Sequence, residues 1–293
     1  MKFTKMHGCG NDYVYINGFE EHIDYEDKPE LVRFLSDRHK GIGGDGAIFI
    51  NPSDVADFEM EMWNADGTRS EMCGNGIRCV GKYVYDHRMT DKTDITVVSA
   101  GAVKFLTLYV EDGLVSSVKV DMGLPILKAD QVPVDLSRVS VSDVSTIKLG
   151  DDEAVKAKLM SCDGEMEFTC VSMGNPHAVT YVEDVYTAGV LTAGAEIEVH
   201  PFFPKKVNVE FIHVVDRTHI DMRVWERGTG ETQACGTGAC ASVVSSILNG
   251  YTDSTVEVSL LGGKLTINWE GIGNHVYMTG PATTVFEGVC EYK

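Results

Sequence analysis

The sequence has 293 residues, of which 43% are hydrophobic and 24% charged, and its formal net charge is −19. This composition is typical of a soluble globular protein, and the length favours about two domains. An acidic chain lacks the clustered Lys and Arg that neutralise phosphates, which excludes nucleic acid as an expected partner.

The chain shows no sign of a membrane partner. No apolar run approaches the roughly 18 residues that a spanning helix needs. The first ten residues lack the apolar core of a signal peptide. We therefore expect a cytoplasmic protein.

Eight cysteines are spread along the chain. An even number suggests a disulfide framework in short secreted chains, but thiols are expected to stay reduced in a cytosolic protein of this size. No Cys-x-x-Cys pair occurs, so the sequence supports neither a zinc site nor a thioredoxin-type motif, and no metal is expected.

The first half of the chain is expected to contain strands around one helix. A glycine-rich turn, 41–46, leads into the apolar run 47–50. After Cys73 the apolar residues share one helical face, at Ile77, Val80 and Val84. Strands are then predicted from β-branched, apolar or alternating sequence, at 94–99, 103–110 (apolar on both faces) and 116–120.

The second half repeats this order. An apolar run at 208–212 precedes Cys235, and 239–248 is small or apolar nearly all round, as in a buried helix. Asn249-Gly250 is a C-cap signal that ends this helix. The β-branched segment 255–260 predicts the next strand.

Two segments, 63–76 and 225–238, closely match, and each ends in Cys-Gly-x-Gly. The Trp-to-Cys separation is the same in both (73 − 63 and 235 − 225). The match extends to 46–50 against 208–212, each starting 27 residues before its cysteine (73 − 46 and 235 − 208).

A repeat of half the chain predicts two similarly folded domains, 1–122 plus 282–293 and 123–281. The predicted fold class is α/β of the α+β type. Two pseudo-symmetric domains each form a curved, mainly antiparallel sheet or barrel around a central helix. A cysteine lies at the N-terminus of each helix.

This position predicts reactive thiols. Unpaired N–H groups and the helix dipole lower the pKa of a cysteine there, and they can also hold a carboxylate. If the two helix starts faced each other across a cleft, one thiolate would remove the α-proton of a bound amino acid. The other thiol would return a proton to the opposite face, while the N–H donors stabilised the charge that develops. Neither a dinucleotide motif nor a P-loop occurs, so no cofactor is expected.

The most specific motifs resemble those of the diaminopimelate epimerase family, and the resemblance covers the whole chain. They are Gly10-Asn11-Asp12, residues 72–78, residues 174–177, residues 225–228 and residues 234–238. The resemblance implies a cofactor-independent isomerase that interconverts LL- and meso-diaminopimelate in lysine and peptidoglycan precursor synthesis. It also implies two pseudo-symmetric domains with the active site between them.

The resemblance implies roles for individual residues. Cys73 and Cys235 would be the two acid/base residues, and His177 would sit beside the thiols and help to set their protonation. The substrate would be bound by Asn11, Asn64, Gly74, Asn75, Asn175, Asn208, Glu226, Arg227, Gly236 and Thr237. One departure is Gly46, which stands where some members carry a glutamine that reaches the substrate.

Other functions stay open at this point. A two-thiol racemase of the proline or hydroxyproline type, or one acting on histidine, uses similar chemistry. Glu226-Arg227 and the asparagines favour a longer substrate with a distal carboxylate and amine. A thiol redox switch is the alternative that is not an enzyme, and the sequence leaves a homodimer undecided.

Overall fold

The computed structural model describes residues 1–70, 73–149 and 152–292. The chain forms two compact units, Met1–Asp121 with Thr279–Lys293 (unit 1) and Met122–Met278 (unit 2). The domain boundaries expected from the sequence, after residues 122 and 281, lie within three residues of these divisions. Glu71 and Met72 of the first cysteine motif lie outside the described residues.

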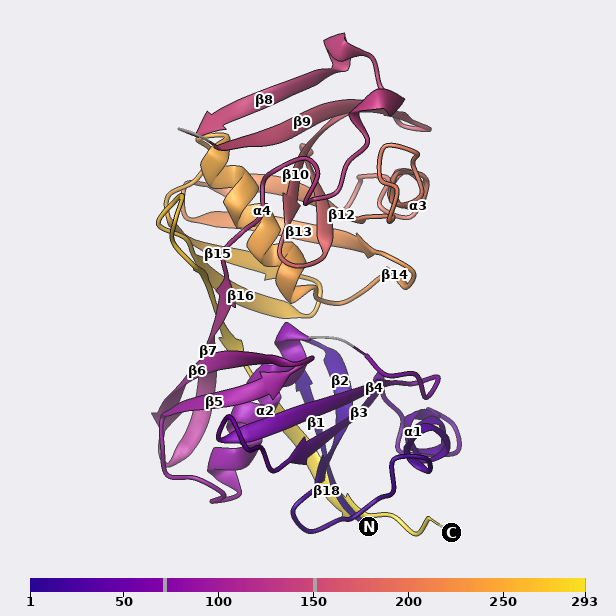
Figure 1. The fold of residues 1–293 in the computed structure, drawn as a ribbon, viewed down its shortest axis with the longest axis vertical. Helices are drawn as coiled ribbons and strands as arrows, with labels where there is room; N and C mark the ends of the chain where they lie inside the picture. Colours follow the sequence, from indigo (N-terminus) through magenta and orange to yellow (C-terminus); the bar gives the residue numbers. More distant parts are fainter. Residues whose placement is uncertain (71–72, 150–151, 293) are drawn as a thin grey trace. The chain divides into compact units, whose positions relative to one another are not determined.

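Unit 1 is built on one mixed sheet (Figure 1). Its strands pair in the order β18-β1-β2-β3-β4-β5-β6-β7, and only the β2–β3 and β4–β5 pairs are parallel. The strands are β1 Lys2–Gly8, β2 Asn11–Asn17, β3 Gly46–Asn51, β4 Phe58–Asn64, β5 Asp94–Ser99, β6 Ala102–Glu111, β7 Leu114–Gly123 and β18 Thr283–Val289.

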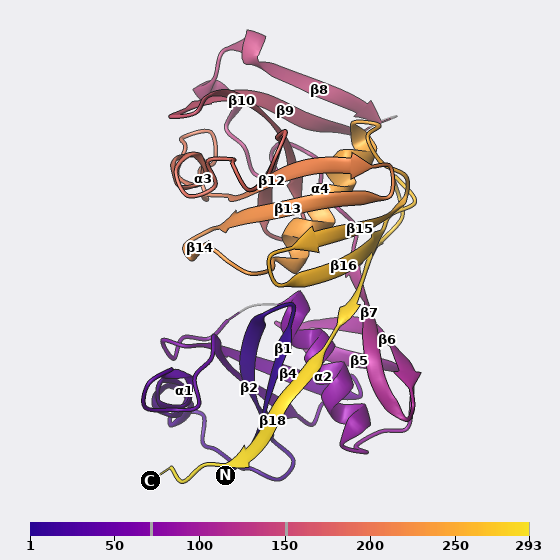
Figure 2. The same ribbon diagram turned by 180° about the vertical axis from the view of Figure 1, so that it is seen from behind.

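Unit 2 has a second mixed sheet (Figure 2). Its strands pair in the order β8-β9-β10-β11-β12-β13-β15-β16, and β14 also pairs with β13. The strands are β8 Val144–Leu149, β9 Asp152–Ser161, β10 Gly164–Ser172, β11 Pro176–Tyr181, β12 Asn208–Asp216, β13 His219–Glu226, β14 Gly230–Glu231, β15 Thr255–Leu260 and β16 Gly263–Asn268; β17 is Val276–Pro281.

The two sheets share one pairing pattern. From β1 to β6 the successive pairs are antiparallel, parallel, antiparallel, parallel and antiparallel. The run β10-β11-β12-β13-β15-β16 repeats this order. The predicted fold class of two pseudo-symmetric units is therefore confirmed.

The helices also occupy matching places. In unit 1, α1 (Lys28–Ser36) connects β2 to β3 and α2 (Gly74–Asp86) connects β4 to β5. In unit 2, α3 (Ala193–Glu198) connects β11 to β12 and α4 (Gly236–Leu248) connects β13, through β14, to β15. Helices α2 and α4 are buried along most of their length against strands of their own unit. The predicted helical face of Ile77, Val80 and Val84 is fully buried.

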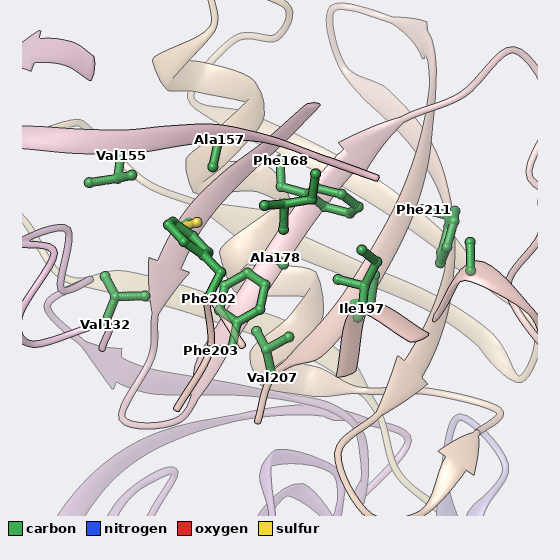
Figure 3. Close-up of a cluster of buried hydrophobic side chains, with 14 of the residues drawn as sticks. Val132, Val155, Ala157, Phe168, Ala178, Ile197, Phe202, Phe203, Val207 and Phe211 are labelled. Atoms are coloured by element: carbon green, nitrogen blue, oxygen red, sulfur yellow. The ribbon is translucent and has the colours of Figure 1, made fainter. Parts of the chain in front are cut away.

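Apolar side chains fill the space between the strands and α1 in unit 1, and between the strands and α3 in unit 2. In unit 2, Phe168, Phe202 and Phe211 pack with Ile197 of α3 and with β9–β12 (Figure 3). In unit 1, Leu31, Val32 and Leu35 of α1 pack on β2, β3 and Trp63.

The strands predicted at 94–99 and 255–260 match β5 and β15. The strand predicted at 103–110, apolar on both faces, lies within β6, which buries Leu106 and Leu108 and leaves Phe105 and Tyr109 exposed. Within the described part of the chain, no helix has the length and apolar character needed to cross a membrane.

Candidate functional site

Cys73 caps the N-terminus of α2. Its backbone is extended, and its sulfur accepts a hydrogen bond from the N–H of Gly76 at 3.3 Å, in the manner of an N-cap side chain. The thiol also donates to Oδ1 of Asn11 at 3.2 Å. Both contacts hold the sulfur at the first turn of the helix, where the dipole is positive.

Asn11 and Asn75 lie beside this thiol. Nδ2 of Asn75 donates to the same Asn11 oxygen at 3.4 Å, and Nδ2 of Asn11 donates to Asp45 at 2.7 Å. Asp45 therefore fixes the orientation of the Asn11 amide, so that its oxygen faces Cys73. The fully buried guanidinium of Arg78 donates to Gly74 O and to Asn75 Oδ1, both at 3.0 Å, and fixes the first turn of α2.

Asn64 ends β4 and is held locally. Its Nδ2 donates to Oγ1 of Thr68 at 3.1 Å, and its N–H donates to the carbonyl of Thr68 at 2.9 Å. The structure thus joins Asn11, Cys73 and Asn75 by hydrogen bonds and places Asn64 in the turn that follows β4.

Cys235 caps α4 in the same way. Its sulfur accepts from the N–H of Gly238 at 3.3 Å and lies 3.5 Å from Oγ1 of Thr237. The side chain is 5% exposed. The cysteine motifs therefore produce the same local structure in both units.

A chain of polar contacts leads from Thr237 into the interior of unit 2. Nδ2 of Asn175 donates to Oγ1 of Thr237 at 3.3 Å, and Oδ1 of Asn175 lies 3.1 Å from Nε2 of His177. Nδ1 of His177 lies 2.7 Å from Oε1 of Glu210. His177 and Glu210 are both completely buried.

Two carboxylates influence Cys235. Burial raises the pKa of Cys235 well above its usual range, and the charges of Glu226 and Glu210 raise it further, outweighing hydrogen bonds from Thr237 and Gly238. The prediction of a lowered pKa at this helix N-terminus is therefore wrong for Cys235: desolvation and two like charges exceed the helix effect.

Glu226 lies at the end of β13. Burial raises the pKa of its carboxyl group, and hydrogen bonds from Thr232 and Cys235 only partly oppose this effect. A carboxyl group with a raised pKa beside a thiol is suited to exchange a proton with it.

Asn208 and Arg227 are joined through the backbone. Oδ1 of Asn208 accepts from the N–H of Arg227 at 2.9 Å, and its Nδ2 donates to the carbonyl of Pro176 at 2.9 Å. The guanidinium of Arg227 donates to the carbonyl of Lys205 at 3.2 Å. Asn208 therefore positions the turn that carries Arg227.

Gly46 begins β3, and a side chain does not fit there. A Cβ at this position would lie 2.0 Å from the carbonyl oxygen of Trp63, which is backbone and cannot move aside cheaply. The local structure of this chain therefore favours glycine at position 46.

Asp45 and Glu210 contact predicted site residues, Asn11 and His177, but no sequence motif predicted either of them. A signal for Glu210 was present: it is the one acidic residue in the run 208–212, and it aligns with Ile48 of the matching run 46–50. Asp45 lies in the glycine-rich turn, which carried no recognisable motif. Among the described residues, no group of three or more His, Cys, Asp or Glu side chains is arranged to hold a metal ion.

The sequence model of the family described as diaminopimelate epimerase matches residues 3–128 and 169–285. The chain belongs to the diaminopimelate epimerase family. A family member from Methanococcus maripaludis is 53% identical over 288 residues, which cover 98% of this chain and 99% of that protein. One from Acetivibrio thermocellus is 53% identical over 289 residues, covering 98% of each.

Solved structures with low sequence identity share the fold. A Bacillus anthracis phenazine biosynthesis protein of the PhzF family has a TM-score of 0.68 at 14% identity, covering 98% of both chains. A hydroxyproline epimerase from Agrobacterium vitis has a TM-score of 0.63 at 16% identity, covering 98% of this chain and 90% of that chain. The epimerase family therefore shares its architecture with proteins of other named activities.

Proposed function

We propose that this chain is a diaminopimelate epimerase that interconverts LL- and meso-diaminopimelate. Its membership of the family supports this activity, because the relatives named diaminopimelate epimerase match along almost the entire chain at about half identity. The observation that carries the mechanism is the cysteine at the N-cap of a buried helix in each unit, at corresponding positions.

We propose a two-base mechanism for this inversion. In one direction a Cys73 thiolate takes the α-proton and becomes a thiol, while the Cys235 thiol gives its proton to the opposite face of the same carbon and becomes a thiolate. The reverse reaction exchanges these roles, so no net proton is consumed. The raised pKa of Cys235 supports its role as the donor in this direction. Glu226 is proposed to take the Cys235 proton when that sulfur must act as the base.

Substrate binding is assigned to groups around the two helix starts. The backbone N–H groups of the first turns, at 74–75 and 236–237, would hold the α-carboxylate and stabilise the charge that develops on proton removal. The distal amine and carboxylate would contact the asparagines, Glu226 and Arg227, whose guanidinium can pair with a carboxylate in a fork. His177 would adjust the protonation of the site through Asn175 and Thr237.

The biological setting follows from this chemistry. We propose that the enzyme works in the cytoplasm, where its thiols stay reduced. It would supply meso-diaminopimelate for lysine and peptidoglycan precursor synthesis.

The activity is tested by incubating the reduced protein with LL-diaminopimelate in D2O, with no pyridoxal phosphate added. We expect the meso isomer to form and deuterium to appear at one α-carbon, measured by NMR. Cys73→Ser and Cys235→Ser should each lower turnover at least about a hundredfold, because each removes an acid/base group. Cys162→Ser, which makes the same change at an exposed position, serves as the matched control.

Folded, reduced protein that exchanges no α-proton would contradict the epimerase activity. Near-normal turnover in either active-site variant would contradict the two-thiol mechanism. Incubation with L-proline, trans-4-hydroxy-L-proline and L-histidine tests the other racemase activities, and we expect no exchange with any of them. Thiol titration under cytosol-like reducing conditions tests the redox switch, which requires a disulfide that persists.

A further inference from the structure

The carboxylate of Glu210 is buried inside the core of unit 2. Glu210 lies on β12, next to Val209, Phe211 and Ile212 in the sequence, and all four side chains are completely buried. Its Oε1 meets His177, whereas its Oε2 is buried with no hydrogen-bond partner among the described residues. Burying a carboxylate in this way costs free energy, so its presence calls for a reason beyond packing.

Unit 1 shows that the fold does not require this charge. Glu210 pairs with Val179 on β11, and at the matching place Ile48 on β3 pairs with Tyr15 on β2. The helices confirm the correspondence between the two positions. A Cβ on Gly238 would lie 2.7 Å from Oε1 of Glu210, and a Cβ on Gly76 would lie 2.8 Å from Cδ1 of Ile48. An aliphatic side chain therefore fills this place in one copy and a carboxylate fills it in the other.

We infer that Glu210 is a positioning residue of the epimerase site, holding His177 so that its Nε2 faces Asn175 and, through Thr237, the Cys235 thiol. This inference rests on the proposed function. A carboxylate oxygen only accepts hydrogen bonds, so Nδ1 of His177 carries a proton in the 2.7 Å contact. The arrangement is that of a histidine oriented by an acidic group on one side while its other nitrogen faces the reacting groups.

The contacts connect Glu210 to the sulfur without a break. They measure 2.7 Å from Glu210 to His177, 3.1 Å to Asn175, 3.3 Å to Thr237 and 3.5 Å to Cys235. The charge of Glu210 also raises the pKa of Cys235, after the larger effects of burial and of Glu226. The same carboxylate therefore orients the imidazole and favours the protonated thiol.

The test replaces Glu210 by an apolar side chain, as at Ile48 in unit 1, and by a neutral polar one. Glu210→Met and Glu210→Gln are measured for kcat and KM by α-proton exchange in D2O and for thermal stability by calorimetry. We expect kcat to fall about ten- to hundredfold with KM little changed, the range found when a carboxylate that orients a metal-site histidine is removed. Thermal stability should also fall in Glu210→Met, because the completely buried Nδ1 of His177 loses its hydrogen-bond partner.

A matched control is Glu61→Gln in unit 1. Glu61 is a buried carboxylate that pairs with Lys28 at 2.7 Å, and it is not part of the proposed site. We expect this variant to lose stability but to keep its kcat, so that the fall in kcat of Glu210→Met can be separated from a loss of stability.

A second readout needs no substrate. In protein with 15N-labelled histidine, Nδ1 of His177, assigned by the signal lost in His177→Gln, should carry a proton in the wild type and lose it in Glu210→Met. An unchanged protonation pattern or an unchanged kcat in Glu210→Met would overturn the inference. Failure of the proposed function would appear separately, as a wild-type protein that exchanges no α-proton.

Discussion

At the scale of single residues, Cys235 shows that a helix N-terminus does not by itself make a thiol acidic. The sulfur accepts from the N–H of Gly238, which favours the thiolate, but burial and two carboxylates favour the thiol. The balance is set first by burial and then by the charges of Glu226 on β13 and Glu210 on β12. The reactivity of Cys235 should therefore depend on these carboxylates.

This balance predicts the pH dependence of alkylation at Cys235. Only the thiolate reacts, so the rate of modification by iodoacetamide in a Cys73→Ser background should keep rising with pH beyond the range of an ordinary cysteine. Glu226→Gln removes a negative charge, which lowers the pKa of the thiol, so the profile should move to lower pH and the rate at neutral pH should increase. Glu231→Gln is the control, because its carboxylate pairs with Arg223 at 2.7 Å. Superimposable profiles for Glu226→Gln in this background and for its Cys73→Ser parent would refute this explanation.

Residue-scale prediction from sequence succeeded where the signal was local. The repeated Cys-Gly-x-Gly motif predicted a cysteine at the start of a helix, and both cysteines are N-caps. The pKa of Cys235 and the role proposed for Glu210 depend on burial and on contacts between separate strands, which one sequence does not display. The roles of the other site residues stay predictions.

At the scale of elements, the first turns of α2 and α4 share a backbone but contact different neighbours. Gly76 and Gly238 are each the third residue of their helix. A methyl group on Gly76 would meet the end of the flexible Ile48 side chain, whereas one on Gly238 would meet a carboxylate held by His177. The same substitution should therefore have different consequences in the two helices.

We predict that Gly238→Ala lowers kcat about ten- to hundredfold, because it displaces the Glu210 carboxylate or the Cys235 turn from its working position. Gly76→Ala should have a much smaller effect, because Ile48 can change its side-chain conformation and alanine favours the helix. Calorimetry should show an overpacking cost of about 1–3 kcal/mol for Gly238→Ala. Equal losses of kcat in the two variants would mean that the neighbouring carboxylate is irrelevant.

At the scale of the whole molecule, the internal repeat explains how much of the fold was predictable. Matching spacings before each cysteine predicted two similar units, and the two sheets follow one pairing order. Strand pairing between distant segments was not predictable from periodicity, because nothing local identifies the partner. The return of the chain to unit 1 was expected from the sequence, which assigned 282–293 to the first domain, but the strand with which it pairs was not: β18 pairs with β1 across almost its full length.

This return predicts a stability effect confined to one unit. Ending the chain after Ala282 removes β18, leaves β1 as an edge strand, and removes Phe286, which meets the Phe3 ring edge to face at 5.9 Å. The lost hydrogen bonds, each worth about 0.5–1.5 kcal/mol, should together lower the unfolding midpoint by roughly 10 °C. Hydrogen exchange should increase in β1 and β2, while β10–β13 keep their protection. A chain ending after Glu291 keeps the β18 ladder and should behave like the full chain. If the chain that ends after Ala282 lost hydrogen-exchange protection equally in both units, the prediction would be contradicted, because the two units would then unfold as one cooperative body.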